Sequence, residues 1–216
     1  AWRGRWAAEV VRAKLRRQRR TLRHLADGAP TGSGSDRRAA ERGLDKALAE
    51  LAKESPAPER LRGLEGGAAR AYFTGLAAVA PARLEFAGRN KRPPRDPLNA
   101  CLSLGYTLLH AEAVQAALTR GLDPYLGFYP RPAYNRESLA SDLIEPLRPA
   151  VDAWAVELFR QRRLTPDQFH TSGEGCFLSK SGRGRYYQAF EEAAGPWRRR
   201  LRWSVIGLKR GLLDRA

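Results

Sequence analysis

Residues 61–73 read LRGLEGGAARAYF, and the spacing of their apolar side chains decides the fold class. Leu61, Leu64, Ala68 and Tyr72 follow one another at intervals of three and four residues, which places them on one face of a helix. The same spacing continues through most of the chain, in which Ala and Leu, both strong helix formers, are frequent. No clear strand alternation and no internal repeat is found. The sequence therefore predicts an all-α fold.

Further helices are predicted on both sides of this stretch, because Gly, Pro and Ser interrupt the apolar spacing where a helix would end. The predicted elements of the first half are, in order, a helix at about 5–26, a flexible loop at 27–36 with Ser35 or Asp36 as the next N-cap, a helix ending before Ser55, and a helix starting near Glu59. They are followed by an apolar helix that Asp96-Pro97 caps and opens and that runs to about Thr119, a helix from a Ser138 cap toward Phe159, a turn or hairpin at 172–175, and a basic helix at about 184–210. Pro146 is expected to bend or break the helix that it interrupts.

The composition is that of a folded, basic protein. With 216 residues, of which 43% are hydrophobic, the chain can bury a core, which excludes a disordered polybasic tail. We expect one helical domain over residues 1–216. No run of about 18 apolar residues is present, so neither a membrane span nor a membrane partner is expected. Two cysteines, Cys101 and Cys176, form neither a disulfide framework nor a zinc pattern, which is typical of a cytoplasmic protein.

The positive charge is concentrated in three segments. The formal net charge is +16, and residues 1–25, 83–95 and 183–210 carry local net charges of +8, +4 and +6. Clustered charge on a chain that also has a core favours a polyanion such as nucleic acid as the partner, because neutralised phosphates release counterions. The alternatives on composition alone are a solvated surface, an anionic membrane face or a basic RNA-binding module.

Three acidic residues are candidates for chemistry. Glu65 is followed by Gly66 and Gly67, whose bare backbone leaves room for a phosphodiester to approach. Asp142 and Glu145 are three residues apart and therefore share a helix face. Carboxylate oxygens of this kind hold Mg²⁺ or Mn²⁺. The alternatives are an exposed helix glutamate and an acidic pair favoured by the helix dipole.

Four motifs in a fixed order resemble a known family. Residues 61–73 resemble the signature R-G-x-E-G-x-A-A-R-x-Y-F of the CRISPR adaptation integrase, CRISPR-associated protein one. The order continues with RPPRDPLNACLS at 92–103, GLDPYLGF at 121–128 and SLASDLIEPLRP at 138–149, so that the motif core spans about residues 60–150. The resemblance implies the helical C-terminal domain of that family. The family's N-terminal β-rich domain is expected to lie outside this sequence.

The resemblance also implies a site for a divalent metal. Its ligands in the family are a glutamate of the first motif, a histidine after L-G-F and an aspartate of the last motif. Glu65 and Asp142 then fill the catalytic and metal-binding positions, whereas Pro130 stands where the family has histidine. Glu145, one helical turn from Asp142, is the candidate substitute ligand. The implied cofactor is Mg²⁺ or Mn²⁺.

The function that the resemblance implies is DNA integration and endonuclease activity in CRISPR spacer acquisition. The 3′-hydroxyl ends of a protospacer are joined to the CRISPR repeat by metal-dependent transesterification. The implied partners are double-stranded DNA, a second copy in a homodimer and a small ferredoxin-like adaptation subunit. The alternative is a catalytically impaired DNA-binding scaffold of the same family, disarmed at Pro130. The residues expected to contact phosphates are Arg89, Lys91, Arg92, Arg131, Arg136, Lys180, Arg183 and Arg185.

Overall fold

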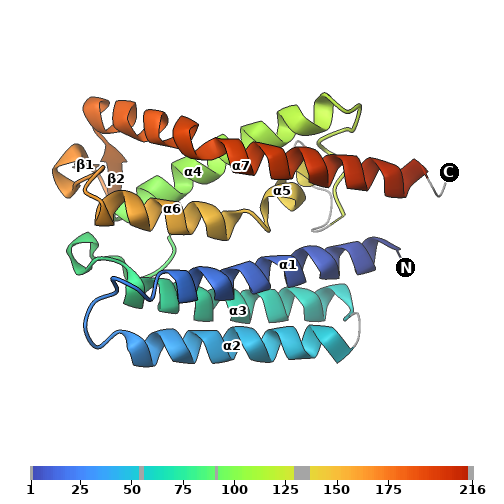
Figure 1. Ribbon diagram of the computed structural model, residues 1–216, viewed down its shortest axis with the longest axis horizontal. Coiled ribbons are helices and arrows are strands. Elements are labelled where there is room, and N and C mark those ends of the chain that lie inside the picture. The colour runs from blue at the N-terminus through green and yellow to red at the C-terminus, as the bar shows by residue number, and fades with distance from the viewer. Residues whose placement is uncertain (1, 54–55, 91, 129–136, 214–216) are drawn as a thin grey trace.

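The computed structural model describes residues 2–53, 56–90, 92–128 and 137–213 and confirms the all-α prediction (Figure 1). The described helices are α1 (Trp2–His24), α2 (Gly34–Lys53), α3 (Pro58–Val79), α4 (Pro97–Leu118), α5 (Ser138–Ile144), α6 (Arg148–Arg160) and α7 (Lys180–Leu213), with short 3₁₀ helices at Ala82–Leu84 and Pro166–Gln168. A two-stranded antiparallel hairpin, β1 (Phe169–Ser172) and β2 (Gly175–Leu178), precedes α7. The hairpin agrees with the turn or hairpin predicted at 172–175.

Helices α1, α2 and α3 form one layer and pack against one another. Their apolar faces meet in a shared core that includes Leu22, Leu44 and Leu76, all fully buried. Gly75 lets α2 and α3 approach closely, because a Cβ atom on this residue would lie 2.6 Å from the Ala40 Cβ. The spacing seen in residues 61–73 therefore directs α3 into this layer.

Helices α4 to α7 form the second layer, and α6 joins the two layers by packing on both α1 and α4 (Figure 1). The N-cap predicted for α4 is confirmed: Asp96 accepts a hydrogen bond from the Asn99 backbone N–H at 2.8 Å. Gly105 of α4 permits a close crossing, since a Cβ atom there would lie 2.7 Å from the Tyr186 hydroxyl of α7. The second layer therefore places α5 and α6 next to α1.

The break predicted at Pro146 is confirmed. Proline has no backbone N–H, so the helix ends at Ile144 and resumes at Arg148. The Leu147 backbone N–H bonds to the Ile144 carbonyl at 2.8 Å, which closes a tight turn. We call residues 145–147 the elbow.

Several predicted boundaries were wrong. The first helix occupies Trp2–His24 rather than 5–26, and α2 starts at Gly34, inside the loop predicted at 27–36, where the Arg37 N–H already bonds to the Ser33 carbonyl. Ser138 is the first residue of α5 rather than its cap. Helix α7 starts at Lys180 instead of 184, because Ser179 caps it by accepting from the Gly182 N–H at 3.1 Å.

No helix within the described ranges is long and apolar enough to cross a membrane. Cys101 and Cys176 are both buried free thiols, in line with the absence of a disulfide framework from the sequence.

Candidate functional site

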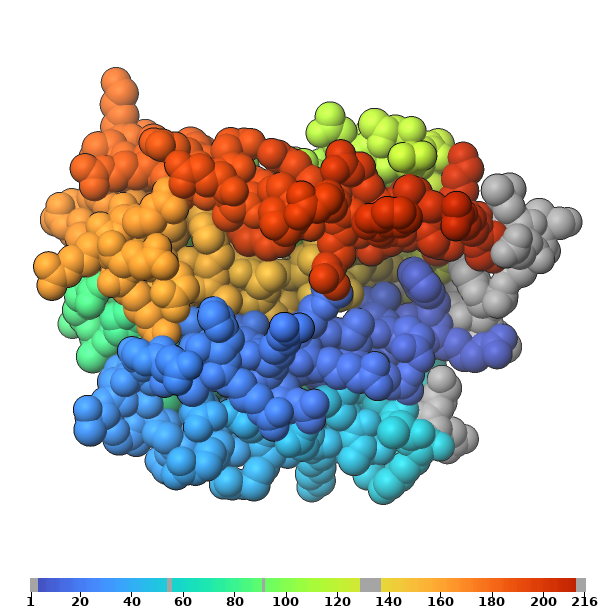
Figure 2. Space-filling view, in the orientation of Figure 1, coloured from blue at the N-terminus to red at the C-terminus, as the bar shows by residue number. Residues whose placement is uncertain are grey.

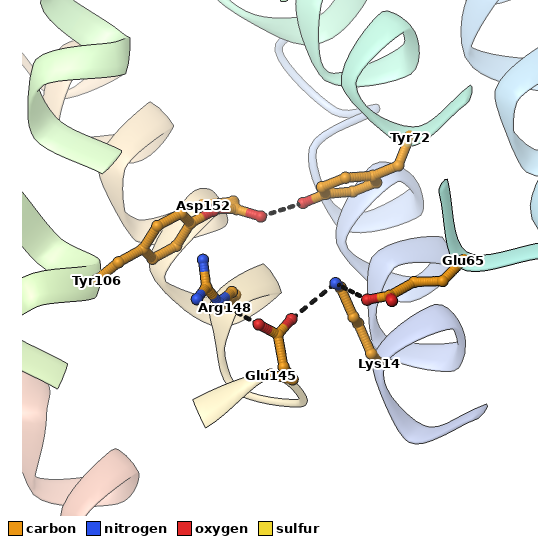
Figure 3. A network of polar contacts seen from close by, with 7 residues as sticks. All are labelled: Lys14, Glu65, Tyr72, Tyr106, Glu145, Arg148 and Asp152. Carbon is orange, nitrogen blue, oxygen red and sulfur yellow. Dashed lines mark hydrogen bonds and ion pairs between the residues drawn. The ribbon is translucent and has the colours of Figure 1, made fainter. Parts of the chain in front are cut away.

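Two of the predicted acidic residues converge on a lysine that the sequence did not single out (Figure 3). Glu65 projects from α3, Glu145 from the elbow and Lys14 from α1. The Lys14 Nζ lies 2.6 Å from Glu65 Oε1 and 2.7 Å from Glu145 Oε2. The structure therefore brings Glu65 and Glu145, which are far apart in the sequence, to a single cationic group. We call these three residues the carboxylate centre.

The carboxylate centre is largely shielded from water. The exposed fractions of the Lys14, Glu65 and Glu145 side chains are 13%, 19% and 17%. Burial alone lowers the pKa of Lys14, but Glu145 and Glu65 outweigh it, so that the pKa is raised above its ordinary value. Lys14 is therefore a stable positive charge that compensates the two carboxylates.

A second positive charge adjoins this centre. Arg148, in the first turn of α6, forms an ion pair with Glu145 over 3.0 Å between Nε and Oε1. Its guanidinium also lies over the ring of Tyr106, 4.6 Å from the ring centroid. Arg148 thus connects the carboxylate centre to the core of the second layer (Figure 3).

The core next to Arg148 contains a buried aspartate, Asp152. Tyr72 donates its hydroxyl hydrogen bond to Asp152 Oδ2 at 2.7 Å, and Tyr106 donates to Oδ1. Burial raises the pKa of Asp152 to about 6, and the two tyrosines and the nearby arginines limit this rise. Because the tyrosines come from α3 and α4, Asp152 of α6 ties the two layers together behind the site.

Asp142, the predicted partner of Glu65, has a different environment. It is 2% exposed, and its Oδ2 accepts a hydrogen bond from the Phe128 backbone N–H at 2.6 Å. Gly127, which precedes Phe128, lies against the start of α5, because a Cβ atom on Gly127 would be 2.6 Å from Ser138. The Asp142 side chain therefore positions the 127–128 segment.

No group of three or more His, Cys, Asp or Glu side chains suited to a metal occurs among the described residues. Pro130, which stands at the family's histidine position, lies outside them. His110, a histidine of α4, pairs with Glu137, with 3.5 Å between Nδ1 and Oε2. Of the three predicted carboxylate ligands, Glu65 and Glu145 share the Lys14 ammonium, and Asp142 of α5 precedes Glu145 by three residues.

The predicted phosphate contacts fall into three groups. Lys91, Arg131 and Arg136 lie outside the described residues. Arg92, Lys180, Arg183 and Arg185 are exposed, the last three at the start of α7. Arg89 is instead held within the protein, since it donates to Asn99 Oδ1 at 2.8 Å and to Ser103 Oγ at 3.0 Å. The exposed arginines and lysine are available to a polyanion, whereas the Arg89 guanidinium is hydrogen-bonded to side chains of α4.

Lys14 and Arg148 are the site residues that sequence reasoning missed. Lys14 follows Val10 and Val11 by four and three residues and so shares their helix face. A lysine at an apolar face of an Arg-rich helix was the available signal. Arg148 follows Glu145 by three residues, a spacing that predicts an ion pair on a helix.

The chain is similar to known proteins in both sequence and fold. A profile of the family described as "CRISPR associated protein Cas1" matches residues 1–192. The chain is 38% identical over 211 residues to the protein named "CRISPR-associated endonuclease Cas1 1" of Thermodesulfovibrio yellowstonii, covering 97% of this chain and 66% of that protein. The chain therefore spans less than two thirds of the length of this curated relative.

Two solved structures share the fold. One, "Casposase bound to integration product", has a TM-score of 0.75 and 25% identity and covers 88% of this chain and 52% of the casposase chain. The other, "Cas6-RT-Cas1--Cas2 complex", has a TM-score of 0.83 and 23% identity and covers 97% of this chain and 24% of that chain. With the family profile covering most of its length, the chain belongs to the CRISPR associated protein Cas1 family.

Proposed function

We propose that this chain is the helical catalytic domain of a DNA integrase and endonuclease of CRISPR spacer acquisition, which joins protospacer 3′-hydroxyl ends to the CRISPR repeat by metal-dependent transesterification. Family membership supports the endonuclease class. The observation that carries the proposal is the convergence of Glu65 and Glu145 on one cationic group in a largely shielded site.

The donor set fits Mg²⁺ or Mn²⁺. Glu65 and Glu145 offer hard carboxylate oxygens at a point that already accommodates the positive charge of Lys14. Mg²⁺ is commonly held by one or two carboxylates, with water and substrate phosphates completing its shell. Such an ion polarises a phosphoryl oxygen and favours ionisation of an attacking hydroxyl.

The protein's own residues have distinct parts in this proposal. Glu65 and Glu145 hold the cation and fix its place between α3 and the elbow. Asp142 acts one step away, because its hydrogen bond to the Phe128 N–H positions the 127–128 segment beside α5. Lys14 and Arg148 supply positive charge next to the carboxylates, where a phosphodiester would otherwise be repelled.

The partners belong to the same proposal. The exposed residues Arg92, Lys180, Arg183 and Arg185 are suited to contact DNA phosphates. The casposase of the similar solved structure is bound to an integration product, which supports DNA as the substrate. We carry over the homodimer and the small ferredoxin-like adaptation subunit from the family, in which one solved assembly with this fold contains Cas1 and Cas2.

A catalytically impaired DNA-binding scaffold is the second candidate. It is favoured by Lys14, whose ammonium already compensates both carboxylates, and by Pro130 at the histidine position. In this case DNA would bind in the same way, but no metal-dependent joining would follow.

The test is a strand-transfer assay on a supercoiled plasmid that contains the repeat, with labelled duplex DNA, Mg²⁺ or Mn²⁺, and the small adaptation subunit. Wild type, Glu65→Ala and Pro130→His are compared, and a duplex with 3′-dideoxy ends is the chemical control. Joining that requires the metal and is abolished by Glu65→Ala would establish the integrase. Joining only by Pro130→His would establish the scaffold, and joining that survives Glu65→Ala would refute both assignments of the site.

A further inference from the structure

A hollow lined by arginines lies between α1 and α7. Its volume is about 710 Å³, and Leu147 and Ala150 lie at its floor. The side chains that give it its chemical character are Arg17, Arg20, His24, Arg199, Arg200 and Trp203. Figure 2 shows this face of the molecule, with the α5–α6 region visible between the flanking helices. We call this feature the α1–α7 groove.

The groove continues beyond this hollow. A second hollow of about 480 Å³ shares Arg17, Leu147, Arg200 and Trp203 with the first and extends to Trp6 and Asp142. The two therefore form one trough along α1 from His24 to Trp6. The 18 steps from residue 6 to residue 24, at a helical rise of about 1.5 Å each, give it a length of about 27 Å. This length suits an extended chain rather than a compact small molecule.

The positive charge of the groove is unbalanced in the first hollow, whereas the second hollow is also lined by Glu9 and Asp142. No acidic side chain lines the first hollow, and Arg20, Arg199 and Arg200 have no carboxylate partner within the part of the chain that the structure describes. The pKa of Arg17 is lowered by burial and by the nearby Arg200, which faces it from the other wall. Guanidinium groups crowded in this way repel one another, and an anionic ligand would remove that repulsion.

An exposed indole completes the groove. Trp203 has 69% of its surface exposed, the largest value among the large hydrophobic residues described. An aromatic face beside arginines is the combination that binds single-stranded nucleic acid, in which bases are free to stack. Arg17 and Arg200, on opposite walls, lie close enough for Arg200 to lower the pKa of Arg17, so one strand between them can contact both guanidinium groups.

We propose that the α1–α7 groove binds single-stranded DNA, with its phosphates on Arg17, Arg20 and Arg200 and a base stacked on Trp203. The choice of DNA over other single-stranded polyanions rests on the proposed function. A concave trough does not match the flat surface of a bilayer, and its charge does not match a second copy of this basic chain. Lys14, Glu65 and Glu145 are not among the residues that line the two hollows, so the groove is a strand-binding site distinct from the carboxylate centre.

The experiment measures the fluorescence anisotropy of a labelled single-stranded DNA about 20 nucleotides long, in EDTA, over a range of salt concentrations. The groove variants are Arg20→Gln/Arg200→Gln and Trp203→Ala. The control, Arg16→Gln/Arg210→Gln, removes the same charge from exposed positions of α1 and α7 outside the groove. Circular dichroism establishes that all four proteins are folded, and a duplex of the same length and anionic vesicles are competitors.

The groove pair should weaken binding by about tenfold and reduce the slope of log K against log salt by about 1.4, the value for two phosphate contacts on a single strand. Trp203→Ala should weaken binding by about tenfold through lost stacking, and the control should change it by less than twofold. Equal losses in the control and the groove pair, or equal competition by the duplex or by vesicles, would overturn the proposal.

The experiment distinguishes failure of the strand-binding proposal from failure of the proposed integrase function. EDTA removes divalent metal, so strand binding does not depend on the carboxylate centre, and Glu65→Gln should bind the strand as wild type does. Loss of strand binding in the groove variants would establish the groove even if no version joins DNA. Conversely, metal-dependent joining together with wild-type strand binding in the groove pair would exclude the groove and leave the integrase intact.

Discussion

Glu65 and Glu145, 80 residues apart in the sequence, place Oε1 and Oε2 within 2.6 and 2.7 Å of the same Lys14 Nζ. Three segments that each look ordinary alone, an Arg-rich helix, a Gly-rich helix and a helix break, thus meet at one point. The charge balance at this point leads to the first two predictions.

Replacing Lys14 by Gln should destabilise the protein when divalent metal is absent. The two carboxylates then lose their shared cation in a shielded site, and we expect a loss of about 2 kcal/mol in the free energy of unfolding. Mn²⁺ should raise the melting temperature of Lys14→Gln more than that of wild type, because it replaces the missing charge. Thermal unfolding with and without Mn²⁺ measures both effects.

The control for this prediction is Lys53→Gln, which removes an exposed lysine paired with Glu50. That variant should unfold close to the wild-type temperature, since exposed ion pairs contribute little. Equal responses of the two variants to Mn²⁺ would show that the carboxylate centre does not bind the metal.

The acidic residues should differ in their effects on DNA joining. Glu65→Gln and Glu145→Gln each remove a proposed metal ligand, and we expect at least a 100-fold lower rate of joining. Asp142→Asn keeps a carbonyl oxygen that can accept from the Phe128 N–H, so its rate should fall by less than about tenfold. Initial rates of strand transfer measure this order, and a larger loss in Asp142→Asn than in Glu145→Gln would reverse the assignment.

Asp152 should make stability depend on pH. Its folded-state pKa of about 6 lies above the ordinary 3.8, so the folded protein binds a proton more tightly than the unfolded chain. This contribution to stability is complete below pH 4 and is lost as the pH rises toward 6, by about 3 kcal/mol in total. Asp152→Asn should therefore show a weaker fall in stability between pH 4 and 6 than wild type.

Urea unfolding across this pH range measures the difference. Burial also raises the pKa of Asp96, which acts in the same direction in both proteins, so the comparison isolates Asp152. Parallel stability curves for wild type and Asp152→Asn would contradict the raised pKa.

Gly75→Ala should destabilise the first layer by about 1–3 kcal/mol through overpacking. The new Cβ would lie 2.6 Å from the Ala40 Cβ and 2.9 Å from Leu22 Cδ1, and neither helix can move without disturbing the core. Gly63→Ala on the same helix meets no atom within 4 Å and should be stabilising by up to about 1 kcal/mol. Denaturant unfolding of the two variants should give opposite signs.

Local signals in the sequence predicted most of the helices. The Asp96 cap and the break at Pro146 depend on backbone chemistry within a few residues, and both were correctly expected. The start of α7 was missed because Gly182 and Gly184 resemble a loop, whereas the Ser179 cap and tertiary packing hold the helix.

The candidate site was predicted only in part. Glu65, Asp142 and Glu145 were all identified, Glu65 and Asp142 as ligands implied by the family resemblance and Glu145 by its helical spacing from Asp142. The elbow separates Asp142 from Glu145, so that one carboxylate meets a backbone N–H and the other meets Lys14. Lys14 reaches the site through the tertiary packing of α1, and the spacing of residues within 61–149 does not predict that packing.

The elbow also changes what the backbone is used for. In an uninterrupted helix the Pro146 carbonyl would bond to the amide of residue 150, but the Ala150 N–H bonds to the Leu147 carbonyl, and the Pro146 oxygen accepts from Arg17 Nη1 at 2.7 Å. The Pro146 carbonyl, which would accept a hydrogen bond within an uninterrupted helix, thus anchors the start of α6 to α1, one turn from Lys14. The orientation of the Glu145 carboxylate is therefore fixed by its neighbour Pro146, whose side chain has no functional group.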